Sequence, residues 1–141
     1  MAKQDCLFCK IIKGKLPSYQ VYETERVAAF LDLYPINRGH TLIVPKHHQR
    51  DIRDARQEDL AEIMEAAQKL ANLYQDSLDA VGFNLKCNSG PQAHQEVMHL
   101  HFHLIPRYRD DGLQLTHDHY EASEEELETV QQNITSHLAQ S

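Results

Sequence analysis

The sequence has no tryptophan, only three cysteines, and no run of about 18 apolar residues that could cross a membrane. An odd number of cysteines, in a chain whose first residues form no apolar signal segment, argues against a disulfide framework. Internal repeats and low-complexity tracts are also lacking. We therefore expect one globular domain over residues 1–141, in the reducing cytoplasm and not in a membrane.

Positive charge is scarce as well: 14 lysines and arginines stand against 21 aspartates and glutamates, which gives a formal net charge of −7. A general binder of nucleic acid or of anionic membranes needs a cationic face, so neither partner class is expected. A small phosphorylated ligand stays compatible with this charge, because a few local donors are enough to hold it. Hydrophobic residues at 41% and charged residues at 25% are typical of a soluble globular chain.

The hydrophobic periodicity predicts short strands in adjacent pairs, one long helix between two groups of strands, and a second helix at the end. Apolar residues recur at helical spacing from Leu60 to Tyr74, after a capping box formed by Asp54 and Gln57. A second capping signal at Ser123 opens an amphipathic helix over about 123–139. Strands are expected at residues 19–22, 27–31, 41–44, 83–86 and 97–105, the last ended by Pro106, with a short helix at 7–12. This order favours an α+β fold with an antiparallel sheet over a doubly wound parallel sheet.

Three histidines alternate with apolar residues in the segment His99-Leu100-His101-Phe102-His103-Leu104-Ile105. Successive side chains of a strand point to opposite faces, so the imidazoles are expected on one face, roughly 7 Å apart, with the apolar residues in the core. Near neutral pH, imidazole acts as a nucleophile, an acid or base, and a metal ligand. The spacing leaves a metal site and a site for anion chemistry equally open, and three solvated histidines on an edge strand are a third interpretation.

Cys6 and Cys9 are two residues apart, which suits tetrahedral zinc, but one such pair is only half of a site. From the spacing alone, two ordinary reduced cysteines are the simpler interpretation. The histidines that could complete a site are His47, His48, His94 and His99.

Three separated blocks of the sequence, at residues 39–46, 88–90 and 95–103, resemble the histidine triad (HIT) family of nucleotide hydrolases and transferases. The similarity runs from about Asp5 to Arg107 and is strongest to the bacterial-type, adenosine phosphoramidase-like branch. The resemblance implies an α+β domain that forms a homodimer through a helix and the sheet edge. The sheet would then continue from one protomer into the other.

The resemblance also implies catalytic roles. His101 matches the nucleophile that attacks an α-phosphate and gives a nucleotidyl-histidine, which water resolves. A strand-held imidazole suits this role, because one ring nitrogen can attack while the other donates to a main-chain carbonyl. His103 matches the histidine that donates hydrogen bonds to phosphate oxygens, and His40 matches a fourth histidine that supports the triad.

The nucleotide site implied by the resemblance contains a carboxylate, two amides and three apolar side chains. Asp32 matches the carboxylate that binds the ribose hydroxyls, and Asn88 and Gln95 match amides near the phosphate. The apolar walls around the base match Phe8, Ile11 and Leu33. Without the resemblance, Asp32 reads as the start of a turn, and Phe8 and Ile11 read as core.

Members of this branch with a cysteine pair bind a structural zinc, and the matching ligands here are Cys6, Cys9, His48 and His99. Such a closed site, with one zinc per chain and no organic cofactor, would contribute folding free energy and would not be the catalyst. Two positions depart from the family pattern: His94 stands where the family often has a glycine, and Glu96 stands where it often has a serine or threonine near the leaving group. The leaving group is therefore the least determined part of the chemistry.

The sequence thus predicts an enzyme that cleaves phosphoramidate or phosphoanhydride bonds at the α-phosphate of purine nucleotides through His101. A non-catalytic zinc- and nucleotide-binding regulatory module is the alternative. A metallohydrolase that holds zinc with the triad itself is a weaker variant.

Overall fold

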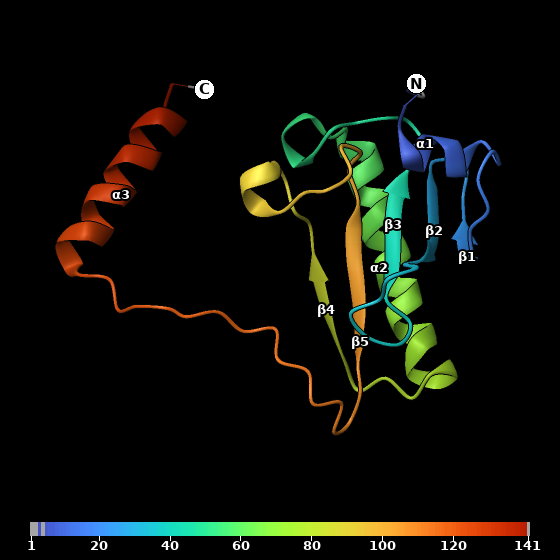
Figure 1. The fold of residues 1–141 in the computed structure, drawn as a ribbon. Helices are drawn as coiled ribbons and strands as arrows, with labels where there is room; N and C mark the ends of the chain where they lie inside the picture. The colour runs from blue at the N-terminus through green and yellow to red at the C-terminus, as the bar shows by residue number, and fades with distance from the viewer. Residues whose placement is uncertain (1–2, 4, 141) are drawn as a thin grey trace.

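The computed structural model describes Lys3 and residues 5–140, and it centres on a five-stranded antiparallel sheet with the strand order β1-β2-β3-β5-β4 (Figure 1). The α+β fold with an antiparallel sheet is thereby confirmed. The predicted bounds of the short helix and of the first four strands agree within one residue. Four residues of the predicted domain range lie outside the described part: Met1, Ala2, Gln4 and Ser141. The helices and strands are α1 (Leu7–Ile12), β1 (Gln20–Glu23), β2 (Val27–Leu31), β3 (Thr41–Pro45), α2 (Gln57–Ser77), β4 (Gly82–Lys86), β5 (Phe102–Arg107) and α3 (Glu124–Leu138).

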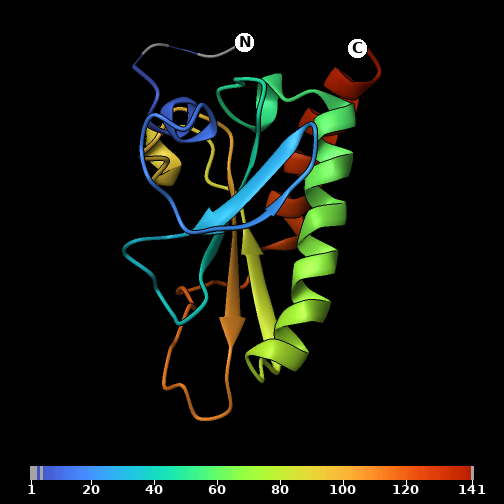
Figure 2. The same cartoon turned by 90° about the vertical axis from the view of Figure 1, so that its right-hand side faces the viewer.

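The two faces of the sheet are covered by different helices, α2 on one face and α1 on the other (Figure 2). The alternation along β2 shows the two layers, because Val27 and Ala29 pack in the α2 core while Ala28 and Phe30 pack in a smaller core beneath α1. The apolar residues between the histidines belong to the α2 core, as predicted: Leu100, Phe102 and Leu104. The histidines consequently face the α1 side.

The predicted strand over residues 97–105 is wrong at both ends. β5 begins only at Phe102 and continues past Pro106, which stands opposite Phe83 of β4. The main chain before β5 is bonded elsewhere, since the Leu100 N–H donates to the carbonyl of Gln49 at 2.7 Å. The three histidines therefore share one face of the sheet without sharing one strand.

The capping box predicted for the long helix is also wrong. α2 does begin at Gln57, but its N-cap residue is Arg56, whose side chain makes no capping hydrogen bond. The Asp54 carboxylate instead accepts main-chain hydrogen bonds from Arg50 at 3.1 Å and Asp51 at 2.9 Å. Asp54 therefore organises the turn ahead of the helix, and the local pattern alone did not distinguish the two uses.

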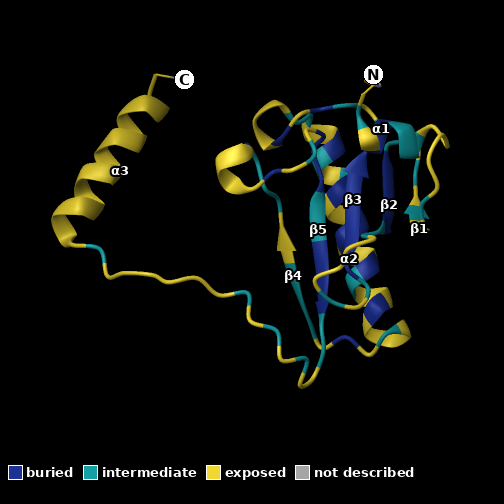
Figure 3. Cartoon of the chain, in the orientation of Figure 1, coloured by how far each residue is buried: buried dark blue, intermediate teal, exposed yellow. Residues whose placement is uncertain are grey.

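The C-terminal helix α3 begins where the sequence predicted, because the Ser123 hydroxyl accepts a hydrogen bond from the Glu126 N–H at 3.1 Å. An extended segment links α3 to β5, and the helix stands beyond the β4 edge of the sheet (Figure 1). None of its described residues is buried (Figure 3). Among the described residues, no helix combines the length and the apolar character that crossing a bilayer requires.

Candidate active site and metal cluster

Three imidazoles lie in contact at the start of the central strands. His101 immediately precedes β5, His103 lies within it, and His40 immediately precedes β3. The ring centroids are 4.9 Å apart for His101 and His103 and 5.1 Å apart for His40 and His103. The distance between His101 and His103 is shorter than the roughly 7 Å expected between alternate residues of a regular strand, because His101 lies outside β5. His40 and His101 are 2% and 5% exposed, so the row is largely screened from water.

The tautomer of His101 is set by the main chain. Its Nδ1 lies 2.7 Å from the carbonyl oxygen of His99, and a carbonyl can only accept a hydrogen bond. Nδ1 therefore carries the proton, and Nε2 presents a lone pair. Burial lowers the pKa of His101, which keeps the ring neutral near neutral pH. The imidazole is thus held in the form required of a nucleophile.

A directed relay of hydrogen bonds fixes the other two rings. The Ile36 N–H donates to Nδ1 of His40 at 3.0 Å, so the His40 proton sits on Nε2. That Nε2–H donates to Nδ1 of His103 at 2.9 Å, which places the His103 proton on its own Nε2. Burial lowers the pKa of His40 and takes the pKa of His103 to about 3. His103 is consequently a neutral hydrogen-bond donor.

The same region contains a group with metal-ligating atoms within 4.8 Å of one another: Asp32, His40 and His103. A metal at Nε2 of His40 would require the proton on Nδ1, as is usual for metal-bound histidine. Nδ1 already accepts the Ile36 N–H, so two protons would then point at each other. The arrangement therefore favours the relay over a metal-bound triad.

Asp32 borders this relay and also starts a turn. Its Oδ1 accepts the Tyr34 N–H at 2.8 Å, and its Oδ2 lies 3.6 Å from Nε2 of His40. The side chain is 21% exposed, so it is within reach of a ligand. The turn interpretation of Asp32 agrees with the structure, and its contact with a ribose stays a prediction.

The side-chain amide of Gln95 is committed to the main chain. Its Oε1 accepts the Gly90 N–H at 2.8 Å, and its Nε2 donates to two carbonyls at 2.7 and 3.0 Å. Asn88 makes a longer contact, from Nδ2 to the carbonyl of His94 at 3.4 Å. Gln95 thus closes the loop that carries Asn88, and the phosphate contacts expected of both residues stay predictions.

The three residues expected around the base differ in exposure. Phe8 is 4% exposed, and its ring meets the His101 ring edge-on with centroids 5.0 Å apart. Ile11 packs in the same core beneath α1, whereas Leu33 is 64% exposed in the loop after β2. Phe8 and Ile11 therefore belong to the core beneath α1, where Phe8 packs against His101, and a role as base walls stays a prediction for all three.

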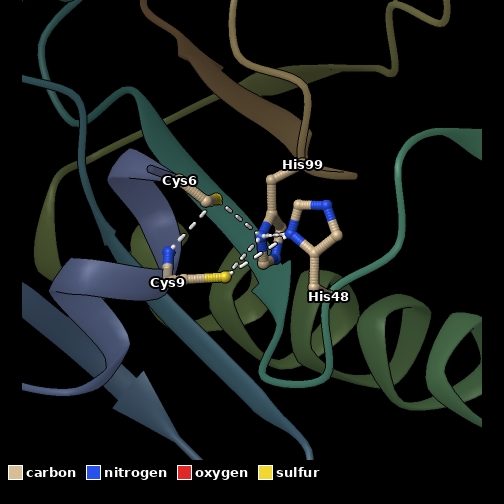
Figure 4. A group of neighbouring side chains, drawn as sticks. All are labelled: Cys6, Cys9, His48 and His99. Carbon is tan, nitrogen blue, oxygen red and sulfur yellow. Dashed lines mark hydrogen bonds between the residues drawn. The ribbon is translucent and has the colours of Figure 1, made fainter. Parts of the chain in front are cut away.

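The second predicted site brings two cysteines of the N-terminal segment against two distant histidines (Figure 4). Nδ1 of His99 lies 3.2 Å from Sγ of Cys6 and 3.5 Å from Sγ of Cys9. Nδ1 of His48 lies 3.4 Å from Sγ of Cys9 and 3.1 Å from Nδ1 of His99. In a tetrahedral zinc site, bond lengths of about 2.3 Å to sulfur and about 2.0–2.1 Å to nitrogen put neighbouring ligand atoms about 3.3–3.8 Å apart. The four residues fit zinc with small adjustments.

The protonation of His99 suits a metal ligand. Its Nε2 lies 2.9 Å from the carbonyl of Pro45, so Nε2 donates and the Nδ1 lone pair points at the thiols. Burial lowers the pKa of His99 to about 4, which favours the neutral ring that a metal needs. Two other candidate partners, His47 and His94, are not part of the described cluster.

Glu96 is exposed and lines a cavity of about 580 Å³ beside the cysteine–histidine cluster. Lys3, Asp5 and Met98 also line it. The negative charge of Glu96 raises the pKa of His101, against the larger lowering by burial, so its field reaches that ring. Glu96 is thus placed to influence charged groups that approach His101.

The main-chain carbonyl expected as the partner of His101 is that of His99, a residue that the sequence did not identify. Sequence reasoning missed the other main-chain groups that orient the rings, the Ile36 N–H and the carbonyl of Pro45. Every residue carries such groups, so no residue type marks them in the sequence.

The family model described as HIT domain matches residues 13–110, which is more than half of the chain. This range includes the three histidines of the candidate active site: His40, His101 and His103. The chain belongs to the HIT domain family. The resemblance found in the sequence is thereby confirmed, while Cys6 and Cys9 lie ahead of the matched range.

Two curated relatives cover nearly all of the chain. "Protein hit" of Bacillus subtilis is 39% identical over 143 residues, which is 98% of this chain and 97% of that protein. Adenosine 5'-monophosphoramidase hnt1 of Schizosaccharomyces pombe is 34% identical and covers 94% of this chain and 98% of its own length. At the level of the family, these matches support a nucleotide hydrolase or transferase.

Solved structures of HIT proteins share the fold. The Streptococcus mutans protein SMU.412c is 36% identical with a TM-score of 0.90, and the match covers 97% of this chain and 87% of that one. This match therefore extends through α3. A Zn-bound histidine triad protein of Mycobacterium smegmatis is 37% identical with a TM-score of 0.76, over 81% of this chain and 83% of its own.

Proposed function

We propose that this HIT-family chain cleaves purine nucleotide derivatives, phosphoramidates or phosphoanhydrides, at the α-phosphorus through a covalent nucleotidyl intermediate on His101. The observation that supports this most is the hydrogen bond from Nδ1 of His101 to the carbonyl of His99 at 2.7 Å. It assigns the proton to one ring nitrogen and the attacking lone pair to the other. Relatives named adenosine 5'-monophosphoramidase support the same reaction class.

The reaction proceeds in two displacements at phosphorus. Nε2 of His101 bonds to the α-phosphorus, and the bond to the leaving nitrogen or oxygen breaks with its electron pair, after which the leaving group takes up a proton. The ring is cationic in the intermediate, and the His99 carbonyl stabilises that charge through Nδ1–H. Water then attacks phosphorus, the bond to Nε2 breaks, and a nucleoside monophosphate and a proton are released with His101 neutral again.

His103 supplies the hydrogen bond to the phosphoryl oxygen that gains charge. Its proton is on Nε2 because Nδ1 accepts from His40, so the donor is oriented before the substrate arrives. His40 acts through His103 and is a positioning residue. Asp32 would accept hydrogen bonds from the ribose hydroxyls, and Asn88 and Gln95 would line the phosphate side. Around the base we place the apolar side chains named by the family resemblance: Phe8, Ile11 and Leu33.

A structural zinc completes the proposal, with one ion per chain held by Cys6, Cys9, His48 and His99. Its chemistry there is folding free energy: a closed set of four protein ligands leaves no coordination position for water or substrate. The cluster thereby ties α1 to the segment that carries the nucleophile.

We also propose a homodimer in the cytoplasm, in which the sheet continues across β4. β4 is an edge strand, and an uncovered edge is a template for pairing. The polar side of α2 contacts the opposite edge, through Glu62 with Thr24 at 2.9 Å and Lys69 with Tyr22 at 3.4 Å. By helical spacing, the flank of α2 on the β4 side carries only uncharged residues, here called the neutral flank: Leu60, Met64, Ala71 and Gln75. This flank beside an edge strand suits a second copy of the chain.

The test is to trap the intermediate. The protein reacts with adenosine 5'-phosphoramidate, the reaction is stopped rapidly without acid, which would cleave a phosphorus–nitrogen bond, and the intact protein is weighed by mass spectrometry. The parent should gain one nucleotidyl group. His101→Asn should gain none and should lose turnover by several orders of magnitude. His47→Asn, which changes an exposed histidine outside the cluster, is the matched control and should behave as the parent.

Residual turnover of His101→Asn within about tenfold of the parent corresponds to only ~1.4 kcal/mol of barrier and would contradict the assignment. Nucleotide binding with no turnover in the parent would identify a regulatory binding module instead. Loss of the adduct on chelation, with the fold intact, would point to a metal in the chemistry.

A further inference from the structure

The helix α3 exposes an apolar stripe outside the sheet domain. Leu127, Val130 and Ile134 recur at helical spacing and are 59%, 47% and 61% exposed. The opposite side of the helix carries polar residues, among them Glu125 and Gln132. The helix is therefore amphipathic and built to cover an apolar surface with one face.

A helix of 15 residues is marginal in water when nothing packs against it. α3 has a hydroxyl cap at Ser123 and acidic residues in its first turn, but these features contribute little compared with burial of an apolar face. A stable α3 therefore needs a surface that covers Leu127, Val130 and Ile134.

The first residues after β5 direct the linking segment, and with it α3, away from the chain's own core. Asp111 accepts from Arg107 Nε at 2.9 Å and from Asn37 Nδ2 at 3.1 Å, which fixes the chain as it leaves β5. The extended segment then carries α3 beyond the β4 edge (Figure 1), on the side of the sheet plane occupied by α2 (Figure 2). The match to the solved structure of SMU.412c covers 97% of this chain, so it extends into α3.

The part of the sheet domain that faces α3 is the edge strand β4, beside the neutral flank of α2 (Figure 1). Leu85 and Val81 at this edge are 43% and 57% exposed. A second copy that joins its β4 to this edge would occupy the space on the β4 side, next to α3. The occupant that the surfaces fit is thus another copy of this chain.

We propose that α3 is an exchanged arm, whose stripe of Leu127, Val130 and Ile134 packs on the second copy and whose counterpart packs on the first. The arm rests on the homodimer proposed above and adds a contact that the sheet edge alone does not provide. It does not depend on the proposed reaction, since no residue of α3 belongs to the nucleotide site.

The test uses the full chain. Dimer dissociation is measured by sedimentation or native mass spectrometry over a dilution series, and amide exchange of α3 is followed at the same concentrations. Ile134→Asp places a charge in the stripe and should raise the dissociation constant at least about tenfold. Gln132→Asp, the same charge on the opposite face, should change it less than about twofold.

Exchange protection of α3 that appears with the dimer and disappears on dilution supports the arm. Protection that is independent of concentration would mean that α3 packs on its own chain, and an unprotected α3 in an intact dimer would mean that no copy covers it; either result overturns the inference alone. A monomer at every concentration would overturn both the arm and the homodimer, while the nucleotidyl adduct on His101 would report independently on the reaction.

Discussion

Single hydrogen bonds decide what each imidazole of the active site can do. His101 and His103 are both neutral and both close to the same space, yet one presents a lone pair and the other a proton. The difference comes from their Nδ1 partners, an acceptor for His101 and a donor for His103. The proposed chemistry at phosphorus needs both a nucleophile and an oxyanion donor, and these two rings can supply one each although they are the same residue type.

Asp32 gives a prediction that separates its two interpretations. Asp32→Ala should weaken binding of adenosine monophosphate by about tenfold or more relative to its effect on the 2',3'-dideoxy analogue, because only the ribonucleotide uses the carboxylate. Titration calorimetry with both ligands measures the difference. Asp32→Asn keeps an acceptor for the Tyr34 N–H, so it serves as the control for the turn. Equal weakening of both ligands would leave Asp32 with the turn alone.

Glu96 gives a prediction about the leaving group. Its charge should repel anionic leaving groups, so Glu96→Ser should raise kcat/KM for a nucleoside polyphosphate several-fold relative to a phosphoramidate whose leaving group is an uncharged amine. Glu96→Gln removes the charge at nearly constant size and should show the same change. Added salt screens an exposed charge, so in the parent it should raise kcat/KM for the polyphosphate relative to the phosphoramidate and reduce the difference between parent and variants. A ratio that stays constant in both variants would remove Glu96 from leaving-group selection.

Among the elements, α1 depends most on contacts outside itself. A helix of six residues is far too short to persist alone, and the cluster holds it through Cys6 and Cys9. Replacing both cysteines with serine should remove bound zinc and lower the melting temperature by roughly 10 °C. Elemental analysis and calorimetry check this. Cys87→Ser, outside the cluster, should keep the zinc and shift the melting temperature by only a few degrees.

Catalysis by the double cysteine variant should largely persist at low temperature, since His101 is not a ligand. Absence of zinc from protein purified without added metal would contradict the proposal, as would ligation through His101 or His103.

The elements also show what the sequence could and could not predict. β2 and the start of α3 follow from local patterns, an apolar run and a hydroxyl cap, and both are confirmed. The histidine strand was predicted too long because alternation reports which side each residue faces and not whether a neighbour pairs with it. Leu100 alternates correctly but bonds to Gln49, outside the ladder. Pro106 lacks an N–H but stays in β5, where β4 still pairs alongside it.

The residues of the site were predictable from the sequence, but the hydrogen bonds that fix their tautomers were not. The motifs and the resemblance named the four cluster residues that the structure brings together, and the cysteine spacing alone named only two of them. The tautomers depend on main-chain groups such as the Ile36 N–H and the Pro45 carbonyl, which only the folded chain places.

For the whole molecule, the buried histidines predict a loss of stability in acid. Burial takes the pKa of His103 to about 3 and lowers that of His40, so between about pH 6.5 and pH 3 the unfolded chain binds more protons. Stability should therefore fall as the pH falls through this window, by at most ~1.4 kcal/mol per pH unit for each group. Urea unfolding at a series of pH values gives the free energy of unfolding as a function of pH, and this free energy should fall less steeply with falling pH for His103→Asn than for the parent. His119→Asn, in the extended segment, should match the parent, and parallel slopes for all three would contradict the prediction.

The cluster has a consequence for the order in which the molecule assembles. It joins Cys6 to His99, 93 positions apart, and four strands and α2 lie between them in the chain. Loop closure over such a separation is slow, so the complete ligand set forms only after most of the sheet has paired. During synthesis the two thiols emerge long before their second histidine. Acquisition of the full set is thus a late event, and it marks a chain in which His101, the proposed nucleophile two residues beyond His99, has already reached its place.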